Sequence, residues 1–129
     1  MLKYFAVCGA LLLTGCSAMQ NISSTQIRNK ESLRLSETLP MTIPQIQAAL
    51  FQNRYACRPL PHLYVDPADA NRGLLVIEII GASRVSVGAL ADFKQSGANT
   101  QVDFYSYYSG WDIMGKELIA AIKQPLVCN

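Results

Sequence analysis

The feature that most constrains this chain is a short apolar stretch close to its N-terminus. Lys3 gives the first residues a positive charge, and residues 5–13, which follow, are all apolar or small. A helix needs roughly 20 apolar residues to cross a bilayer, so this stretch is too short to span a membrane. A charged start followed by a short apolar run is typical of a secretory signal peptide, which the mature protein lacks. The sequence therefore predicts that residues 1–15 are a leader outside the fold.

The leader ends in Leu13-Thr14-Gly15-Cys16, which resembles the lipobox of bacterial lipoproteins. In that family a diacylglycerol is attached to the cysteine thiol, a dedicated peptidase cuts before the cysteine, and the new amino group is often acylated. The resemblance implies a mature chain that begins at a lipidated Cys16 with palmitate-like acyl chains. At about 0.8 kcal/mol per buried CH₂, several such chains form a permanent anchor. The alternative is an ordinary secretory signal with a cysteine there by chance.

The residue after the lipobox cysteine bears on the choice of membrane. In enterobacterial-type sorting, Asp at this position retains a lipoprotein in the inner membrane, whereas Ser releases it to the outer membrane. This chain has Ser17. By the same resemblance we expect the periplasmic face of the outer membrane, with the inner membrane as the alternative.

The length and charge that remain after the leader restrict the domain and its partners. Removing residues 1–15 from 129 leaves 114, which is enough for one domain and too few for two. Lys3 leaves with them, so the 11 Lys and Arg residues fall to 10, against 9 Asp and Glu. A protein that binds nucleic acid needs a basic cluster, and this nearly neutral chain has none. We therefore expect no nucleic-acid partner.

Residues 16–40 have the composition of a linker. They are rich in Ser, Asn, Gln and charged residues, with single apolar residues between them. This composition predicts a flexible tether, which would reach on the order of 70 Å if its last twenty or so residues were fully extended. A short docked helix over Ile27–Leu35 is the alternative. The folded domain is expected over residues 41–129.

Two helices are predicted, one at each end of the domain. Thr42 and Gln45 have the spacing of a capping box, and apolar residues at helical intervals follow, which predicts a helix over residues 43–54. A second helix is expected over residues 110–124, with Ser109 as its N-cap and Pro125 ending it. Its apolar stripe consists of Trp111, Met114, Leu118, Ala121 and Ile122.

Three segments between the helices read as strands. Leu74–Ile80 is a continuous apolar run between two glycines, after a turn-rich loop over residues 66–73, and Thr100–Tyr108 alternates between apolar and polar residues. Arg84–Phe93 is a third strand, although a short helix over Ala89–Ser96 is an alternative for its second half. In that strand we expect these residues to lie on one face: Val85, Val87, Ala89, Ala91 and Phe93.

The predicted fold class is α+β. We expect a small antiparallel sheet of three to four strands, residues 63–65 supplying the fourth, with the N-terminal and C-terminal helices packed on one face. In the order of these elements, the chain resembles the small α/β modules of outer-membrane assembly lipoproteins. That likeness concerns architecture alone.

Two cysteines remain in the mature domain besides Cys16. Cys57 and Cys128 form an even pair in an oxidising compartment, so we expect them to form a disulfide. The alternative is a redox-active or metal-binding pair. Neither cysteine belongs to a CxxC motif or has a histidine near it in sequence, which favours the disulfide.

The sequence offers little for catalysis. His62 is the single histidine, and no nucleophile lies in a motif such as GxSxG. Metal sites need three or four ligands, and the carboxylates are scattered. We therefore expect neither an enzyme nor a bound metal or cofactor.

Aromatic residues gather before the last helix. Tyr105, Tyr107 and Tyr108 precede Trp111, and aromatic side chains are enriched at protein interfaces. These tyrosines belong either to a binding surface or, if both faces of the sheet are covered, to the core. The leading hypothesis is a non-catalytic binding or scaffold lipoprotein of the cell envelope with an envelope-protein partner. The alternative is an inhibitor or immunity lipoprotein that acts against a cell-wall-degrading enzyme or a toxin.

Overall fold

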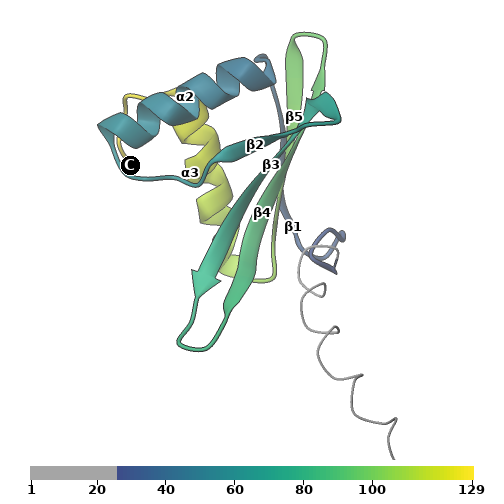
Figure 1. Ribbon diagram of the computed structural model, residues 1–129, viewed down its shortest axis with the longest axis vertical. Coiled ribbons are helices and arrows are strands. Elements are labelled where there is room, and N and C mark those ends of the chain that lie inside the picture. The colour runs from purple at the N-terminus through teal and green to yellow at the C-terminus, as the bar shows by residue number, and fades with distance from the viewer. Residues whose placement is uncertain (1–25) are drawn as a thin grey trace, which may run out of the picture.

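The computed structural model describes residues 26–129, which form one antiparallel sheet with two helices on one of its faces (Figure 1). The α+β class is therefore confirmed, and the strand order across the sheet is β1-β5-β4-β3-β2. The leader, the lipobox and Cys16 lie outside the described residues. The elements are β1 (Leu33–Leu39), α2 (Ile43–Ala56), β2 (Leu63–Asp66), β3 (Asp69–Ile80), β4 (Val85–Ser96), β5 (Asn99–Ser106), the 3₁₀ turn η1 (Ser109–Trp111) and α3 (Asp112–Lys123).

The sheet has five strands, and the prediction of three to four is wrong because it lacked β1. This strand lies inside the segment expected to be a tether, and it pairs with β5 along the edge of the sheet. Leu39 is fully buried, and Glu37 on the same face forms an ion pair with Lys123 of α3. The helix considered over Ile27–Leu35 is also wrong, since residues 33–35 are strand. The fold thus begins well before residue 41.

Helix α2 begins where the capping box places it. The Thr42 hydroxyl accepts a hydrogen bond from the backbone N–H of Gln45, and the Gln45 side-chain oxygen accepts one from the backbone N–H of Thr42. These bonds satisfy two of the N–H groups that a helix start leaves without partners. The helix continues to Ala56, two residues beyond the predicted end, and buries Ile43, Ile46 and Leu50 against the sheet.

Helix α3 is shorter than predicted. The chain first forms η1, and the N-cap of α3 is Trp111 without a side-chain hydrogen bond, so the expectation of Ser109 as N-cap is wrong. The predicted apolar stripe does face the core, with Leu118, Ala121 and Ile122 buried. Gly115 brings the helix close to β5, because a Cβ atom there would lie 2.9 Å from the Phe104 ring.

The predicted central strands are confirmed as β3, β4 and β5, and residues 89–96 are strand rather than helix. The loop expected over residues 66–73 is much shorter, because β3 already begins at Asp69 after a turn at 67–68. A hairpin joins β4 to β5, and Gly97 there has a φ of +60°, which glycine adopts without strain.

A β-bulge in β4 overturns one predicted face. Ile77 pairs with Ala89, but Glu78 pairs with Val87, which leaves Gly88 as an extra residue. The bulge shifts the alternation of side chains, so Val85 and Val87 point away from the face that carries Ala89. The residues from Val85 to Phe93 that were expected to share one face therefore lie on two faces, which divide at Gly88.

The core lies between the sheet and the two helices, and the disulfide closes its edge. The bond joins Cys57, after α2, to Cys128, after α3, with 5.3 Å between their Cα atoms. This confirms the predicted pairing and ties the two helices together at one end. The buried side chains of the core include Leu39, Ile43, Ile46, Leu63, Leu75, Phe93, Val102, Phe104 and Ile122.

Candidate binding surface

His62 lies on the surface and is held by an arginine. A side-chain N–H of Arg54 at the end of α2 donates to Nδ1 of His62 over 2.8 Å, and the His62 ring lies 6.2 Å from that of Tyr64. No serine, threonine or carboxylate of residues 26–129 shares a recorded hydrogen bond with this imidazole. Its neighbours thus position His62 at the surface beside β2.

Metal ligands do not converge anywhere in the described part of the chain. Residues 26–129 contain no group of three or more His, Cys, Asp and Glu side chains that could hold an ion. The same residues contain no helix that is both long and apolar enough to cross a bilayer.

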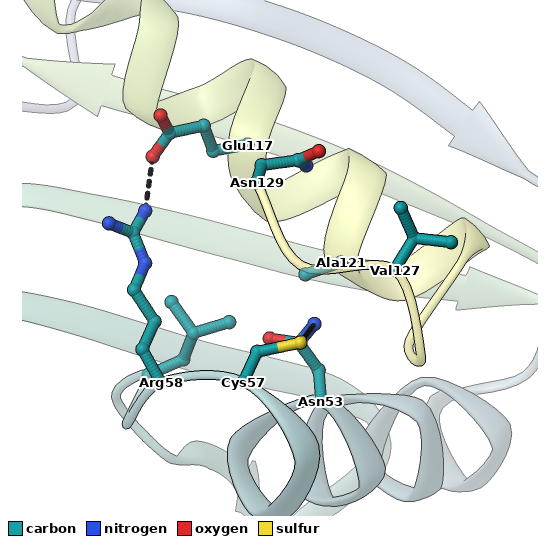
Figure 2. A pocket seen from close by; sticks show the side chains of 8 residues that line it. Asn53, Cys57, Arg58, Glu117, Ala121, Val127 and Asn129 are labelled. Carbon is teal, nitrogen blue, oxygen red and sulfur yellow. Dashed lines mark hydrogen bonds and ion pairs between the residues drawn. The ribbon is translucent and has the colours of Figure 1, made fainter.

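A small pocket lies beside the disulfide (Figure 2). Its volume of about 20 Å³ is room for little more than one water molecule. Arg58 and Glu117 form an ion pair across its mouth, and the Asn53 side chain, which is buried, donates to the carbonyl of Pro125 over 3.0 Å. These contacts hold the chain after α3 against α2, so the pocket has a structural role.

The face of the sheet opposite the helices carries rows of polar and apolar side chains. In one row Leu74 pairs with Asp92, which pairs with Asp103. In the next row Val76 pairs with Leu90, which pairs with Tyr105. Since paired residues share a face, both rows lie on the side that no helix covers. We call this side the open face.

The segment before β1 covers part of the open face. Arg28 forms an ion pair with Asp92, with 2.7 Å between Nε and Oδ2 and a second hydrogen bond to Oδ1. Ile27 and Leu90 are both fully buried although neither belongs to the core under the helices. The adjacent ion pair therefore places Ile27 in a small second cluster on the open face.

Another part of the open face forms a shallow hollow with a volume of about 660 Å³. Tyr64 stands at its edge and is 66% exposed. Its charged side chains have both signs, and a hydrogen bond of 2.6 Å from Ser36 holds Asp103 in place. The charged residues that line the hollow are Arg28, Asp66, Arg72, Asp92, Lys94 and Asp103.

The structure separates the three tyrosines that the sequence grouped. Tyr105 lies half-buried on the open face, beside Asp103, Asp92 and Arg28. The pKa of its phenol is raised, mainly because the side chain is partly buried and also because the two carboxylates lie close to it. Tyr107 and Tyr108 follow the end of β5 and remain 44% and 48% exposed. Tyr108 also stacks on Trp111, with 4.9 Å between the ring centroids. The binding surface expected from these three tyrosines stays a prediction.

Sequence reasoning did not single out Tyr64, Arg72 or Lys94, which line the hollow. They lie on different strands, and only the antiparallel pairing of β2, β3 and β4 brings them together. The signal that the sequence offered for these residues was the alternation of polar with apolar residues along each strand. Comparison of this chain with family models and with curated proteins finds no match.

Proposed function

We propose that the chain is a lipid-anchored, non-catalytic binding module of the bacterial cell envelope, and that the open face contacts an envelope protein. In this proposal the lipid is attached at Cys16 and the domain faces the periplasm from the outer membrane. One observation carries the binding role: the hollow lies on a sheet face that the helices leave uncovered.

The chemistry of the hollow supports a protein partner. Small-molecule sites enclose most of the ligand's surface, whereas this hollow is shallow, lies on a bare sheet face and has charged side chains at six of its twelve lining residues. An exposed tyrosine beside charges of both signs is typical of protein interfaces, in which complementary charges set the partner and its orientation. Tyr64 at the edge of the hollow, with Arg72, Lys94 and Asp103 on the neighbouring strands, fits that description.

Photo-crosslinking in cells tests this role with a matched pair of tyrosines. A photoreactive phenylalanine analogue replaces Tyr64 on the open face or Tyr55 on α2, and both positions are strongly exposed at 66% and 91%. We expect a discrete protein adduct from position 64 and none from position 55. Equal labelling from both positions, or no protein adduct from 64, would contradict a partner on the open face.

The identity of the adduct separates the two functions that the sequence left open. A recurrent envelope-assembly protein supports the scaffold role. A wall-degrading enzyme or a toxin supports the inhibitor alternative, and its inhibition by the purified protein would then be measured.

The anchor needs a separate test because Cys16 lies outside the described residues. Cys16→Ala is expected to release the protein from the membrane fraction, or to leave an unprocessed precursor, whereas Cys8→Ala serves as the control and leaves partitioning unchanged. Mass analysis of the wild-type N-terminus should show the acyl chains. A Cys16→Ala variant that is processed and still partitions with membranes like the wild type would refute the anchor.

A further inference from the structure

We propose that the tip of the β3–β4 hairpin, together with Tyr107 and Tyr108, contacts the headgroup layer of the membrane to which the chain is anchored. This inference rests on the proposed lipid anchor and adds an orientation to it. The occupant of the surface is a phospholipid bilayer.

The hairpin extends beyond the rest of the sheet. Ala89 pairs with Ser106, the last residue of β5, and past this point β3 and β4 continue alone to the pair Ile80 and Val85. Three further residues at about 3.3 Å each carry the ribbon roughly 10 Å past β5, before the turn begins. Figure 1 shows this hairpin reaching below both helices.

The tip carries apolar side chains that nothing in the described chain covers. Ile80 and Val85 face each other across the two strands and are 81% and 59% exposed. Arg84 lies next to them in the turn, and within residues 26–129 no carboxylate forms an ion pair with it. Exposed aliphatic side chains beside a cation suit the boundary between acyl chains and lipid phosphates.

Aromatic side chains lie at the same end of the molecule. Tyr107 and Tyr108 directly follow Ser106, where β5 stops and the ribbon continues. The Trp111 ring packs over Gly88, at the base of the ribbon, and so holds this connection against it. Tyrosine is enriched at membrane interfaces because its ring is apolar and its hydroxyl is polar.

The N-terminal chain enters at this end as well. Leu33, at the start of β1, pairs with Tyr105, which in turn pairs with Leu90 only one residue from Ala89. From Cys16 to Gln26 there are ten residues, which reach at most about 35 Å when fully extended. Because Arg28, two residues after Gln26, pairs with Asp92 on the open face, a lipid on Cys16 would hold the membrane within reach of the hairpin tip.

The size of the tip favours lipid over a folded partner. A stable protein interface covers about 800 Å² on each side. The tip of a two-stranded ribbon offers two exposed aliphatic side chains and a four-residue turn at 81–84, which is far less surface. A bilayer needs no matching shape, and the anchor would already hold the tip beside it.

Lipid crosslinking from two exposed apolar positions tests the inference. The photoreactive analogue replaces Ile80 at the tip or Phe51 on α2, which is 66% exposed. Helix α2 lies away from the tip of the hairpin (Figure 1). The lipidated full-length mature protein is reconstituted into vesicles of phosphatidylethanolamine and phosphatidylglycerol. We expect position 80 to gain the mass of one phospholipid and position 51 to gain none. Because Ile80 is exposed, its replacement leaves the fold intact, which formation of the disulfide verifies.

The outcomes separate this inference from the proposed anchor. If the protein does not float with the vesicles, the anchor and this inference both fail. If it floats and position 80 gains no phospholipid, or positions 80 and 51 label equally, only the membrane contact is overturned. A protein adduct from position 80 in cells, without a lipid adduct, would assign the tip to a protein partner instead.

Discussion

The indole ring of Trp111 occupies the space that a side chain at position 88 would need. A Cβ atom on Gly88 would lie 2.7 Å from Cζ3 of the ring and 2.9 Å from the end of Ile79. The bulge in β4 and the start of α3 are therefore fitted to each other. Since the core is packed at crystal-like density, neither partner can move without affecting the other.

Gly88→Ala is expected to destabilise the protein. The added methyl must displace the Trp111 ring, and overpacking of this kind costs about 1–3 kcal/mol of unfolding free energy. Urea denaturation of the purified mature domain measures the loss. Gly110→Ala is the control, because a Cβ atom there meets nothing within 4 Å, and it should leave stability unchanged or slightly raised. Equal midpoints for the two variants would refute the packing argument.

Loss of the disulfide should weaken the domain strongly. Cys57 and Cys128 are 71 positions apart, and the chain-entropy treatment gives about 4 kcal/mol for a loop of that length. The variant with both cysteines replaced by serine is compared with oxidised and with reduced wild-type protein in urea. We expect the variant to match the reduced protein, and a midpoint like that of the oxidised protein would contradict this prediction.

Ile27→Ala tests whether the segment before β1 is part of the fold. Ile27 is fully buried, and truncating a buried isoleucine costs about 2–5 kcal/mol. Ile113→Ala removes the same atoms from a side chain that is 59% exposed, so its effect should stay within about 0.5 kcal/mol. Thermal or urea unfolding distinguishes the two. If both variants unfold alike, the second cluster on the open face contributes no stability.

Tyr105 should make stability fall at alkaline pH. Burial, then the charges of Asp103 and Asp92, raise the pKa of its phenol above the ordinary value of about 10, while Arg28 partly offsets the rise. The folded state thus holds the proton more tightly than the unfolded state. The resulting stability is fully present below about pH 10 and is lost as the pH rises through the folded pKa.

Two variants check the origin of this effect. NMR titration of the tyrosine ring carbons follows the ionisation of Tyr105 directly, and Asp103→Asn should lower its pKa. Tyr105→Phe should remove this residue's share of the alkaline loss in urea experiments. An unchanged titration in Asp103→Asn would show that the carboxylate does not act on the phenol.

Local signals in the sequence predicted the elements whose formation depends on nearby residues. The capping box of Thr42 and Gln45 identified the start of α2 to the residue. Continuous apolar residues identified the interior of β3, and the alternation between apolar and polar residues identified β5, in which Val102 and Phe104 are fully buried. The pairing of Cys57 with Cys128 followed from counting the cysteines that remain in an oxidising compartment.

Features that depend on distant contacts were not predicted. In β1 Leu35 and Leu39 lie on the covered face, but Glu37 between them interrupts the apolar pattern, and its ion pair with Lys123 explains why it lies there. The bulge at Gly88 shifts the alternation in β4, and the Trp111 ring, which is distant in sequence, packs over it. Secondary-structure propensities and residue spacing depend on neighbours along the chain, so they could predict neither of these two contacts.

The candidate binding surface was predicted least well, for the same reason. The tyrosine cluster was found from composition, yet Tyr105 is half-buried and lies close to Arg28, which belongs to a segment that begins about 80 residues earlier. The hollow uses residues from β2, β3, β4 and β5, so no single stretch of sequence contains it. Only the register of the sheet brings its charges together.

The pairing of β1 with β5 also sets an order of events during synthesis. Leu33 is synthesised early, but its pairing partner Tyr105 follows more than 70 residues later. Cys128, the disulfide partner of Cys57, likewise follows it by 71 residues. Until then β1 is an unpaired strand and the thiol of Cys57 is free to react with other thiols. Since contacts so distant in sequence form slowly, the domain can complete its fold only after nearly all of its chain has emerged. A transport or folding factor that shields an early strand and an early thiol would therefore act on this chain before any binding surface exists.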